Sequence, residues 1–322
     1  MMKRILLFCL TGMMLIMLCS CGGQDAKANI VTDEPAAADT LNNNAPSVTP
    51  TPEAAPVESP DSMSPTPRPG YSTTQTIFPI DNGDNKRYPI IENTTGRTLI
   101  ERVSSNDDSD ASFMLVTKSG KIVVMDPRDM PDQKLFKIKP DIITITHNHG
   151  DHNDASYTNT YIDTAKILTY KTPNDLTLDD IHVYSIVSAH TGNTLIPKLP
   201  TNIIFVYETD GLRIANLGDI GQTKLTDEQL KQIGAIDIVI TQLDNSASAM
   251  NYMTDTKAKD IIAQLNPKII IPAHGGDLYA EDIAEFLGAD YEMLDTILAT
   301  DATELKDAKQ RVVLIKQLEE YE

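Results

Sequence analysis

The chain has 322 residues, of which 46 are acidic, 27 are basic, six are histidine and three are cysteine. Because Cys9, Cys19 and Cys21 all lie near the N-terminus, the rest of the chain cannot form disulfides, cysteine-bound zinc, iron–sulfur clusters or a thiol nucleophile. The net charge of −19 argues against a nucleic-acid partner, since affinity for polyanions depends on lysine and arginine.

The N-terminus has the pattern of a secretory signal. Lys3 and Arg4 precede the apolar run Ile5–Leu18, whose 14 residues are too few to cross a bilayer as a helix. The run ends in Leu18-Cys19-Ser20-Cys21, which resembles the lipobox of bacterial lipoproteins. An ordinary cleaved signal and an uncleaved anchor are the alternatives.

The lipobox resemblance implies a signal peptide at residues 1–20, cleaved before Cys21. Cys21 would then carry two or three acyl chains, and more than one chain gives stable membrane anchoring. The exported protein would be anchored to the outer face of the bacterial cytoplasmic membrane, or on the periplasmic side where a second membrane exists.

The segment 22–75 holds nine of the chain's 19 prolines and almost no large apolar side chains. Such a composition cannot bury enough surface to offset the entropy cost of ordering, so 21–75 is predicted to be a disordered tether. Residues 76–322 have the composition of a globular domain, with 39 acidic and 23 basic residues and thus a net charge of −16. This charge is typical of a solvated surface rather than of a specific cationic partner.

Apolar and β-branched runs predict the strands of the first half of this domain. They are 98–103, 112–117, 121–125, 142–146, 166–170, 181–188, 203–209 and 212–216. Farther on, helices at 226–233, 255–265 and 280–287 alternate with strands at 237–241, 268–271 and 311–315. This order predicts an α+β fold in which two sheets pack together with helices outside.

The strand predicted at 142–146 leads directly into a histidine motif, His147-Asn148-His149-Gly150-Asp151-His152. Imidazole and carboxylate groups suit zinc, iron and manganese as ligands. The spacing of His147 and His149 lets both side chains point the same way from an extended loop. We expect Gly150 to permit a sharp turn that directs Asp151 and His152 elsewhere, so that one segment serves two adjacent metals.

Three further candidates follow predicted strands next to glycines, namely His190, Asp219 and His274. Strand ends are positions from which a rigid sheet presents side chains to a shared crevice. Each residue alone is more typical of a hydrogen-bonded structural group. All three in this order behind the motif form a much stronger pattern.

This order of residues resembles the metallo-β-lactamase-fold hydrolases over about residues 97–320. Within them, Ala111–Asp126, the Gly218–Gly221 turn and Leu225–Glu228 are most similar to the ascorbate-6-phosphate-lactonase-like branch. The resemblance implies a four-layer αββα sandwich with a two-metal site at one edge. It also implies the ligands: one metal bound by His147, His149 and His190, the other by Asp151, His152 and His274, with Asp219 bridging the two.

The predicted function is a metal-dependent hydrolase that uses a hydroxide bridging two divalent ions to attack a small ester, lactone or phosphodiester. Asp151 and Asp219 are the predicted catalytic residues, and zinc is the expected metal, with manganese or iron as alternatives because all ligands are nitrogen or oxygen. A nuclease-type phosphodiesterase and a metal-binding lipoprotein without turnover are the alternative functions, and the acidic charge counts against the former.

Three other residues have open roles. Asp126 is either a partner of a ligand histidine or a turn former. Asp244 is either a substrate contact at the rim or a solvated loop residue. His182 lies within a predicted strand and is interpreted as structural.

Overall fold

The computed structural model describes residues 93–104, 111–128, 130, 139–243, 255–274, 280–295 and 297–316. The predicted signal peptide, Cys21, the tether and Asp244 lie outside these residues. Among the described helices, none is long and apolar enough to cross a membrane.

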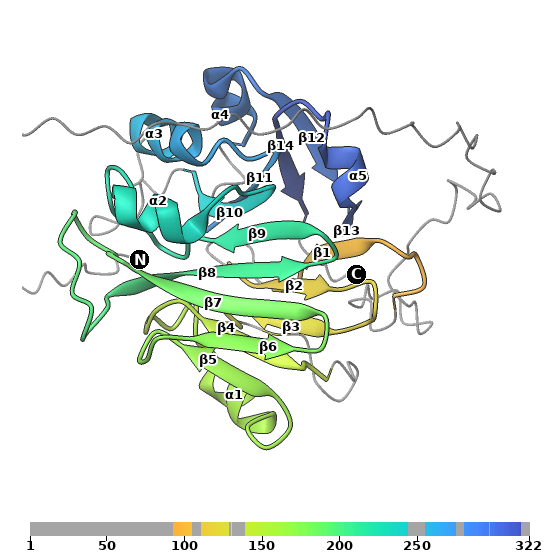
Figure 1. Ribbon diagram of the computed structural model, residues 1–322, viewed down its shortest axis with the longest axis vertical. Coiled ribbons are helices and arrows are strands. Elements are labelled where there is room, and N and C mark those ends of the chain that lie inside the picture. Colours follow the sequence, from red (N-terminus) through yellow and green to blue (C-terminus); the bar gives the residue numbers. More distant parts are fainter. Residues whose placement is uncertain are drawn as a thin grey trace, which may run out of the picture. The chain divides into compact units, whose positions relative to one another are not determined.

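Two sheets form the centre of the domain (Figure 1). The first sheet has six strands in the order β13 (Ile297–Thr300), β1 (Thr98–Arg102), β2 (Phe113–Val116), β3 (Ile122–Met125), β4 (Ile142–Ile145) and β5 (Lys166–Thr169). The second has eight strands in the order β12 (Asp290–Leu294), β14 (Arg311–Ile315), β11 (Ile269–Ala273), β10 (Ile238–Gln242), β9 (Leu212–Asn216), β8 (Asn202–Thr209), β7 (Ile181–Ser188) and β6 (Asp175–Leu178).

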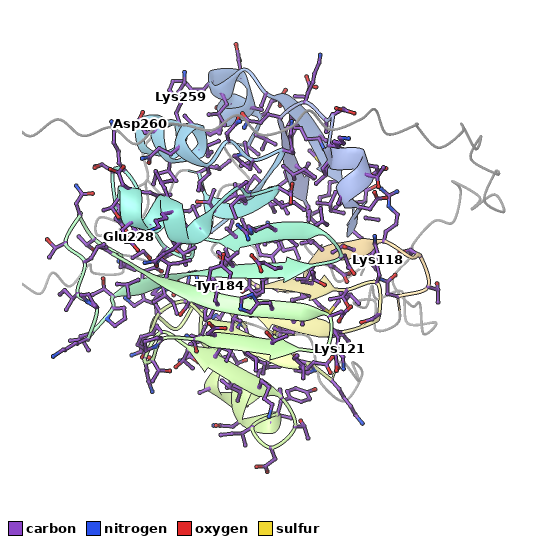
Figure 2. All side chains as sticks on the ribbon, viewed as in Figure 1. Lys118, Lys121, Tyr184, Glu228, Lys259 and Asp260 are labelled. Carbon is purple, nitrogen blue, oxygen red and sulfur yellow. The ribbon has the colours of Figure 1, made fainter. Side chains whose placement is uncertain are left out.

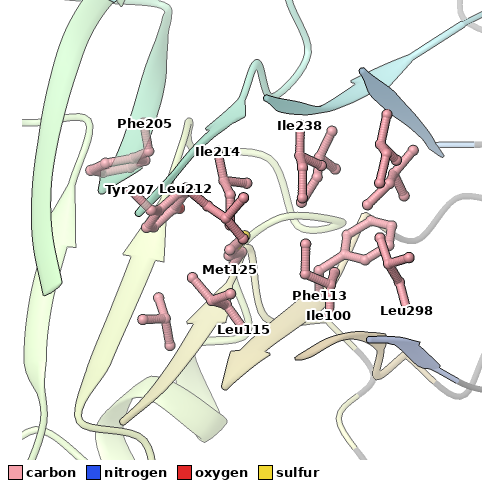
Figure 3. Packing of buried hydrophobic residues seen from close by; sticks show 14 of the residues in the cluster. Ile100, Phe113, Leu115, Met125, Phe205, Tyr207, Leu212, Ile214, Ile238 and Leu298 are labelled. Carbon is pink, nitrogen blue, oxygen red and sulfur yellow. The ribbon is translucent and has the colours of Figure 1, made fainter. Parts of the chain in front are cut away.

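Side chains that point alternately to the two faces of each strand build the core between the sheets. In β8, Phe205 and Tyr207 belong to the apolar cluster that joins the two sheets, together with Phe113 and Met125 of the other sheet (Figure 3). The intervening Val206 belongs to a second cluster, on the opposite face of the same sheet. Because successive side chains of a strand point to opposite faces, the apolar run of β8 is buried on both sides.

Helices cover the two outer faces. The second cluster contains side chains of α2 (Asp227–Ile233), α3 (Asp255–Leu265) and α4 (Ala280–Leu287), and a third packs α1 (Ala155–Thr160) against the six-stranded sheet. Glu228 and Lys259 extend from the exposed faces of α2 and α3 (Figure 2). The layers are therefore helix, sheet, sheet and helix, which confirms the predicted α+β sandwich.

The predicted strands and helices that lie among the described residues are present, with ends that coincide with the prediction or differ from it by at most two residues. Five short elements are not predicted: α1, β6, β12, β13 and α5 (Ala302–Leu305). Their local patterns are too short to indicate structure. β13, for example, exists because all four of its residues pair with β1, almost 200 positions earlier in the chain.

Candidate metal centre

The strands that lead to the candidate residues all end at one edge of the sandwich. In the eight-stranded sheet β7 and β9 are both antiparallel to β8, and β9, β10 and β11 are parallel to one another. The carboxyl ends of β7, β9 and β11 therefore lie on the same side, where His190, Asp219 and His274 follow. In the six-stranded sheet β3 and β4 are also parallel, so Asp126 and the histidine motif follow neighbouring strand ends.

The histidine motif forms a turn in which the His152 N–H donates to the His149 carbonyl at 3.1 Å. The turn is present as predicted, but it does not need a glycine. Gly150 has no left-handed backbone angle, and among the described residues a Cβ there would meet only Arg128, at 3.9 Å. Behind the motif, the Asp154 carboxylate accepts hydrogen bonds from Ser156 and Tyr157 N–H and starts α1.

The fold brings all seven candidate ligands together. In one group, ligand atoms of His147, His149, His190 and Asp219 lie within 4.8 Å of one another; in the other, those of Asp151, His152, His274 and Asp219 do. Asp219 is common to both groups and only 2% exposed, while His149 is the one exposed member. The sites would therefore share one buried carboxylate.

Buried imidazole nitrogens test whether this arrangement fits a metal. Nε2 of His147, His152 and His190 lie 3.6, 3.1 and 3.5 Å from Asp219 carboxylate oxygens. Within the part of the chain that the structure describes, none of the three Nε2 atoms makes a hydrogen bond of acceptable geometry. Leaving a buried polar atom unsatisfied costs free energy. A cation between these nitrogens and the carboxylate would remove that cost, so the residues fit divalent metal ions.

A hydrogen-bond chain fixes the His147 ring. The Thr146 hydroxyl lies 3.0 Å from both Asp126 carboxylate oxygens and 3.1 Å from His147 Nδ1. Its single proton goes to Asp126, since a carboxylate only accepts, and so the hydroxyl accepts from the His147 Nδ1–H. This leaves a lone pair on Nε2, the atom that faces Asp219.

Asp126 lies beside a second ring of the site and at a turn. Its Oδ2 lies 3.3 Å from His152 Nδ1, and its φ of 46° is in the left-handed region. The structure therefore places Asp126 both next to a candidate ligand histidine and in a turn, the two positions expected for it. The second such backbone angle at the site belongs to His274, with φ of 53°. Non-glycine residues rarely adopt this conformation, and such strain is found at functional sites.

The electrostatics favour neutral His147 and ionised carboxylates. Burial, together with repulsion from His152, lowers the pKa of His147 to about 2. Burial is the largest single influence on the pKa of Asp219 and raises it, but the surrounding histidines, His152 first, together hold the pKa well below the usual range. Burial is also the largest influence on the pKa of Asp151 and raises it, but the hydrogen bond from His274 Nε2 at 3.0 Å acts together with the neighbouring His152 and His274 to lower the pKa below its usual value.

Three buried amides support the site, and the sequence analysis missed them. The Asn216 side chain donates to Asp126 Oδ2 at 3.0 Å and accepts from the Gly218 N–H at 3.0 Å. Gln222 Oε1 accepts from the Ala189 N–H at 3.1 Å, next to His190. Asn202 accepts from the Asp219 N–H at 3.2 Å. Asn216 was visible as a polar residue at a strand end, whereas Asn202 and Gln222 have no local signal.

His182 lies apart from the site. Its ring binds Asp175 and Glu208 at 2.9 and 3.0 Å, linking β6, β7 and β8. This position agrees with the structural role expected for it.

Replacing His182 with glutamine is expected to remove a pH-dependent part of the free energy of unfolding. Hydrogen bonds with Glu208, then with Asp175, raise the pKa of His182 above the usual histidine value of 6.5. The stabilisation is therefore complete below the unfolded pKa of about 6.5 and is lost as pH rises through the folded value. Because the side chain is 33% exposed, we expect about 0.5–1 kcal/mol.

Urea unfolding of wild type and His182→Gln at about pH 6 and about pH 9 measures the pH-dependent part of the free energy of unfolding. The difference in free energy of unfolding between wild type and His182→Gln should shrink at the higher pH. Equal differences at both pH values would contradict the prediction.

The comparisons with known proteins agree with this geometry. Residues 109–274 match the Beta-lactamase superfamily domain, a match that contains all seven candidate ligands. The match covers half of the chain, and the chain therefore belongs to this superfamily. With its fold and its two His/Asp groups, it is a metal-dependent hydrolase of the metallo-β-lactamase fold.

Solved structures give weaker similarities. A Thermotoga maritima protein, described as a Zn-dependent hydrolase of the metallo-beta-lactamase superfamily, is 22% identical with a TM-score of 0.48, covering 68% of this chain and 100% of its own. Igni18, a metallo hydrolase from Ignicoccus hospitalis, is 14% identical with a TM-score of 0.45, covering 70% of this chain and 97% of its own. A search of curated proteins gives no match.

Proposed function

We propose that this protein is an exported, membrane-tethered hydrolase with a dinuclear metal centre that cleaves a small ester, lactone or phosphodiester. The observation that carries the proposal is the position of Asp219, whose carboxylate belongs to both ligand groups. A shared carboxylate holds two cations close to each other, which is the arrangement found in two-metal hydrolases.

The roles of the protein's own residues follow from their positions. His147, His149 and His190 would hold one ion, and Asp151, His152 and His274 the other, with Asp219 between them. Such ions supply a hydroxide nucleophile near neutral pH and stabilise negative charge on the attacked group. Asp151 is only partly buried, so its carboxylate would also orient the nucleophile toward a substrate arriving from solvent. All-N/O ligation suits zinc first, and also manganese or iron.

The substrate class is narrowed by resemblance and charge. Ala111–Asp126, Gly218–Gly221 and Leu225–Glu228 resemble the ascorbate-6-phosphate-lactonase-like branch. A net charge of −19 disfavours nucleic acid as a substrate. A small lactone or phosphodiester is therefore the favoured substrate.

Metal quantification followed by a substrate panel tests the proposal. Purified protein should hold about two divalent ions per chain and should turn over lactones, esters or small phosphodiesters. Removal of the ions by a chelator should abolish turnover, and adding back zinc or manganese should restore it. Tight metal binding without turnover would support a metal-binding lipoprotein instead. Cleavage of nucleic acid alone would support the nuclease alternative.

Membrane tethering is tested at Cys21. In a bacterial host, wild-type protein should incorporate labelled palmitate and fractionate with the membrane, because two or three acyl chains give stable anchoring. Cys21→Ser should lose the label and leave the membrane fraction, whereas Cys19→Ser should retain both. Equal fractionation of all three proteins would contradict lipidation at Cys21.

A further inference from the structure

Asn202 is the first residue of β8 and is fully buried. Since β8 is antiparallel to both β7 and β9, Asn202 pairs with Ser188, the last residue of β7. It lies just past the end of β9, whose last residue, Asn216, pairs with Phe205. This is the edge of the sandwich that carries the candidate ligands. Asn202 therefore lies between the strand ends that lead to His190 and Asp219.

The Asn202 amide uses both donor hydrogens and its acceptor oxygen. Nδ2 donates to the Ser188 hydroxyl at 2.7 Å and to the Leu217 carbonyl at 2.9 Å. Oδ1 accepts from the Asp219 N–H at 3.2 Å. Ser188 precedes His190 by two residues, and Leu217 precedes Asp219 by two. One side chain thus joins the backbone of the shared ligand to the strand that carries a second ligand.

The same residue lies against the strand end that carries the histidine motif. The Ile203 N–H donates to the Thr146 carbonyl at 3.0 Å. A Cβ on Gly218 would lie 2.6 Å from Asn202 Oδ1 and 2.7 Å from Thr146 Cβ. The end of β4, the start of β8 and the end of β9 therefore pack closely around Asn202. This packing confines the Gly218–Asp219 backbone to one position.

We propose that Asn202 is a positioning residue that fixes the Asp219 carboxylate relative to His190 and thereby sets the affinity of both metal sites. The proposal rests on the proposed dinuclear centre. The hydrogen bonds of the Asn202 amide go to Ser188, Leu217 and the Asp219 N–H, so Asn202 would act through the backbone of Asp219 and the end of β7. Outer partners of metal ligands typically contribute 10–100-fold to metal affinity. A partner that positions a shared ligand should affect both ions.

The test compares Asn202→Ala with Asn174→Ala in the full chain. Asn174 is also buried, and its Nδ2, which has two hydrogens, lies within hydrogen-bond distance of the Thr169 and Thr172 carbonyls and the Ser185 hydroxyl. None of these partners lies within two residues of a candidate ligand. Both variants should lower the melting temperature, since both remove the hydrogen bonds of a buried amide.

The readout that separates them is metal binding. Titration with zinc against a chromophoric chelator, together with Co²⁺ absorption, should show affinity at least tenfold weaker for Asn202→Ala and unchanged for Asn174→Ala. Wild-type affinity in a folded Asn202→Ala protein, or an equal loss in both variants, would overturn the proposal. Should Asn202→Ala fail to fold, Asn202→Ser, which keeps a small polar group, is measured by the same criterion.

The metal content of the wild-type protein separates a failure of the dinuclear centre from a failure of the role proposed for Asn202. A wild-type protein that binds one ion contradicts the dinuclear centre, while the role of Asn202 is still tested by the affinity for that ion. A wild-type protein that binds no divalent metal overturns both the dinuclear centre and the role of Asn202.

Discussion

Replacing Asp219 with alanine is expected to lower kcat/KM by about 10³-fold or more. Asp219 is the only carboxylate common to both ligand groups of the described residues, so its loss should leave neither site complete. A metal pair contributes several kcal/mol of transition-state stabilisation, and each 1.36 kcal/mol corresponds to a factor of ten in rate. Metal analysis of the variant should give fewer than two ions per chain.

Two further variants separate charge from packing. Asp219→Asn keeps the shape of the side chain and removes its charge. This variant should therefore bind less metal and have lower activity, as Asp219→Ala does. Asp227→Ala removes an exposed carboxylate from the first turn of α2 and should leave both unchanged. Full turnover by Asp219→Ala on lactones and phosphodiesters would refute the shared-ligand mechanism.

Gly221→Ala is expected to destabilise the fold by about 3 kcal/mol and to impair the site. A Cβ at Gly221 would lie 2.0 Å from the carbonyl oxygen of His190 and 2.7 Å from its carbonyl carbon. The contact is with backbone, which cannot rotate away, and overpacking of this kind costs about 1–3 kcal/mol or more. Urea unfolding measures the loss of stability.

The activity of Gly221→Ala should fall as well, because any relief of the contact moves His190. Displacing a catalytic group by about 1 Å costs about 10²-fold in rate. Gly150→Ala is the matched control inside the histidine motif, where the nearest described atom to a new Cβ is Arg128 Nη1, at 3.9 Å. We expect it to change stability by less than about 0.5 kcal/mol. Similar losses in both variants would contradict this reading of the turn.

Much of the site could be predicted because its chemistry is local in the sequence. His147, His149, Asp151 and His152 lie within six residues, directly behind an apolar run that could only be a buried strand. The other three candidates each follow such a run. The central strands were also predictable, since apolar runs such as Ile203–Tyr207 of β8 are buried on both faces whatever their neighbours.

The sequence by itself determined the kinds and order of the candidate ligands, the absence of thiol chemistry behind Cys21, and the two-sheet architecture. The family resemblance implied which ligands share a site, but only the tertiary structure shows the contacts that bring them together and hold them. His274 meets Asp151 from 123 positions away, and Asn216 meets Asp126 from 90 positions away. Such contacts arise from strand order and from which strand ends share an edge. No local pattern encodes them, and for the same reason the supporting Asn202 and the short strand β13 were visible only once the chain was folded.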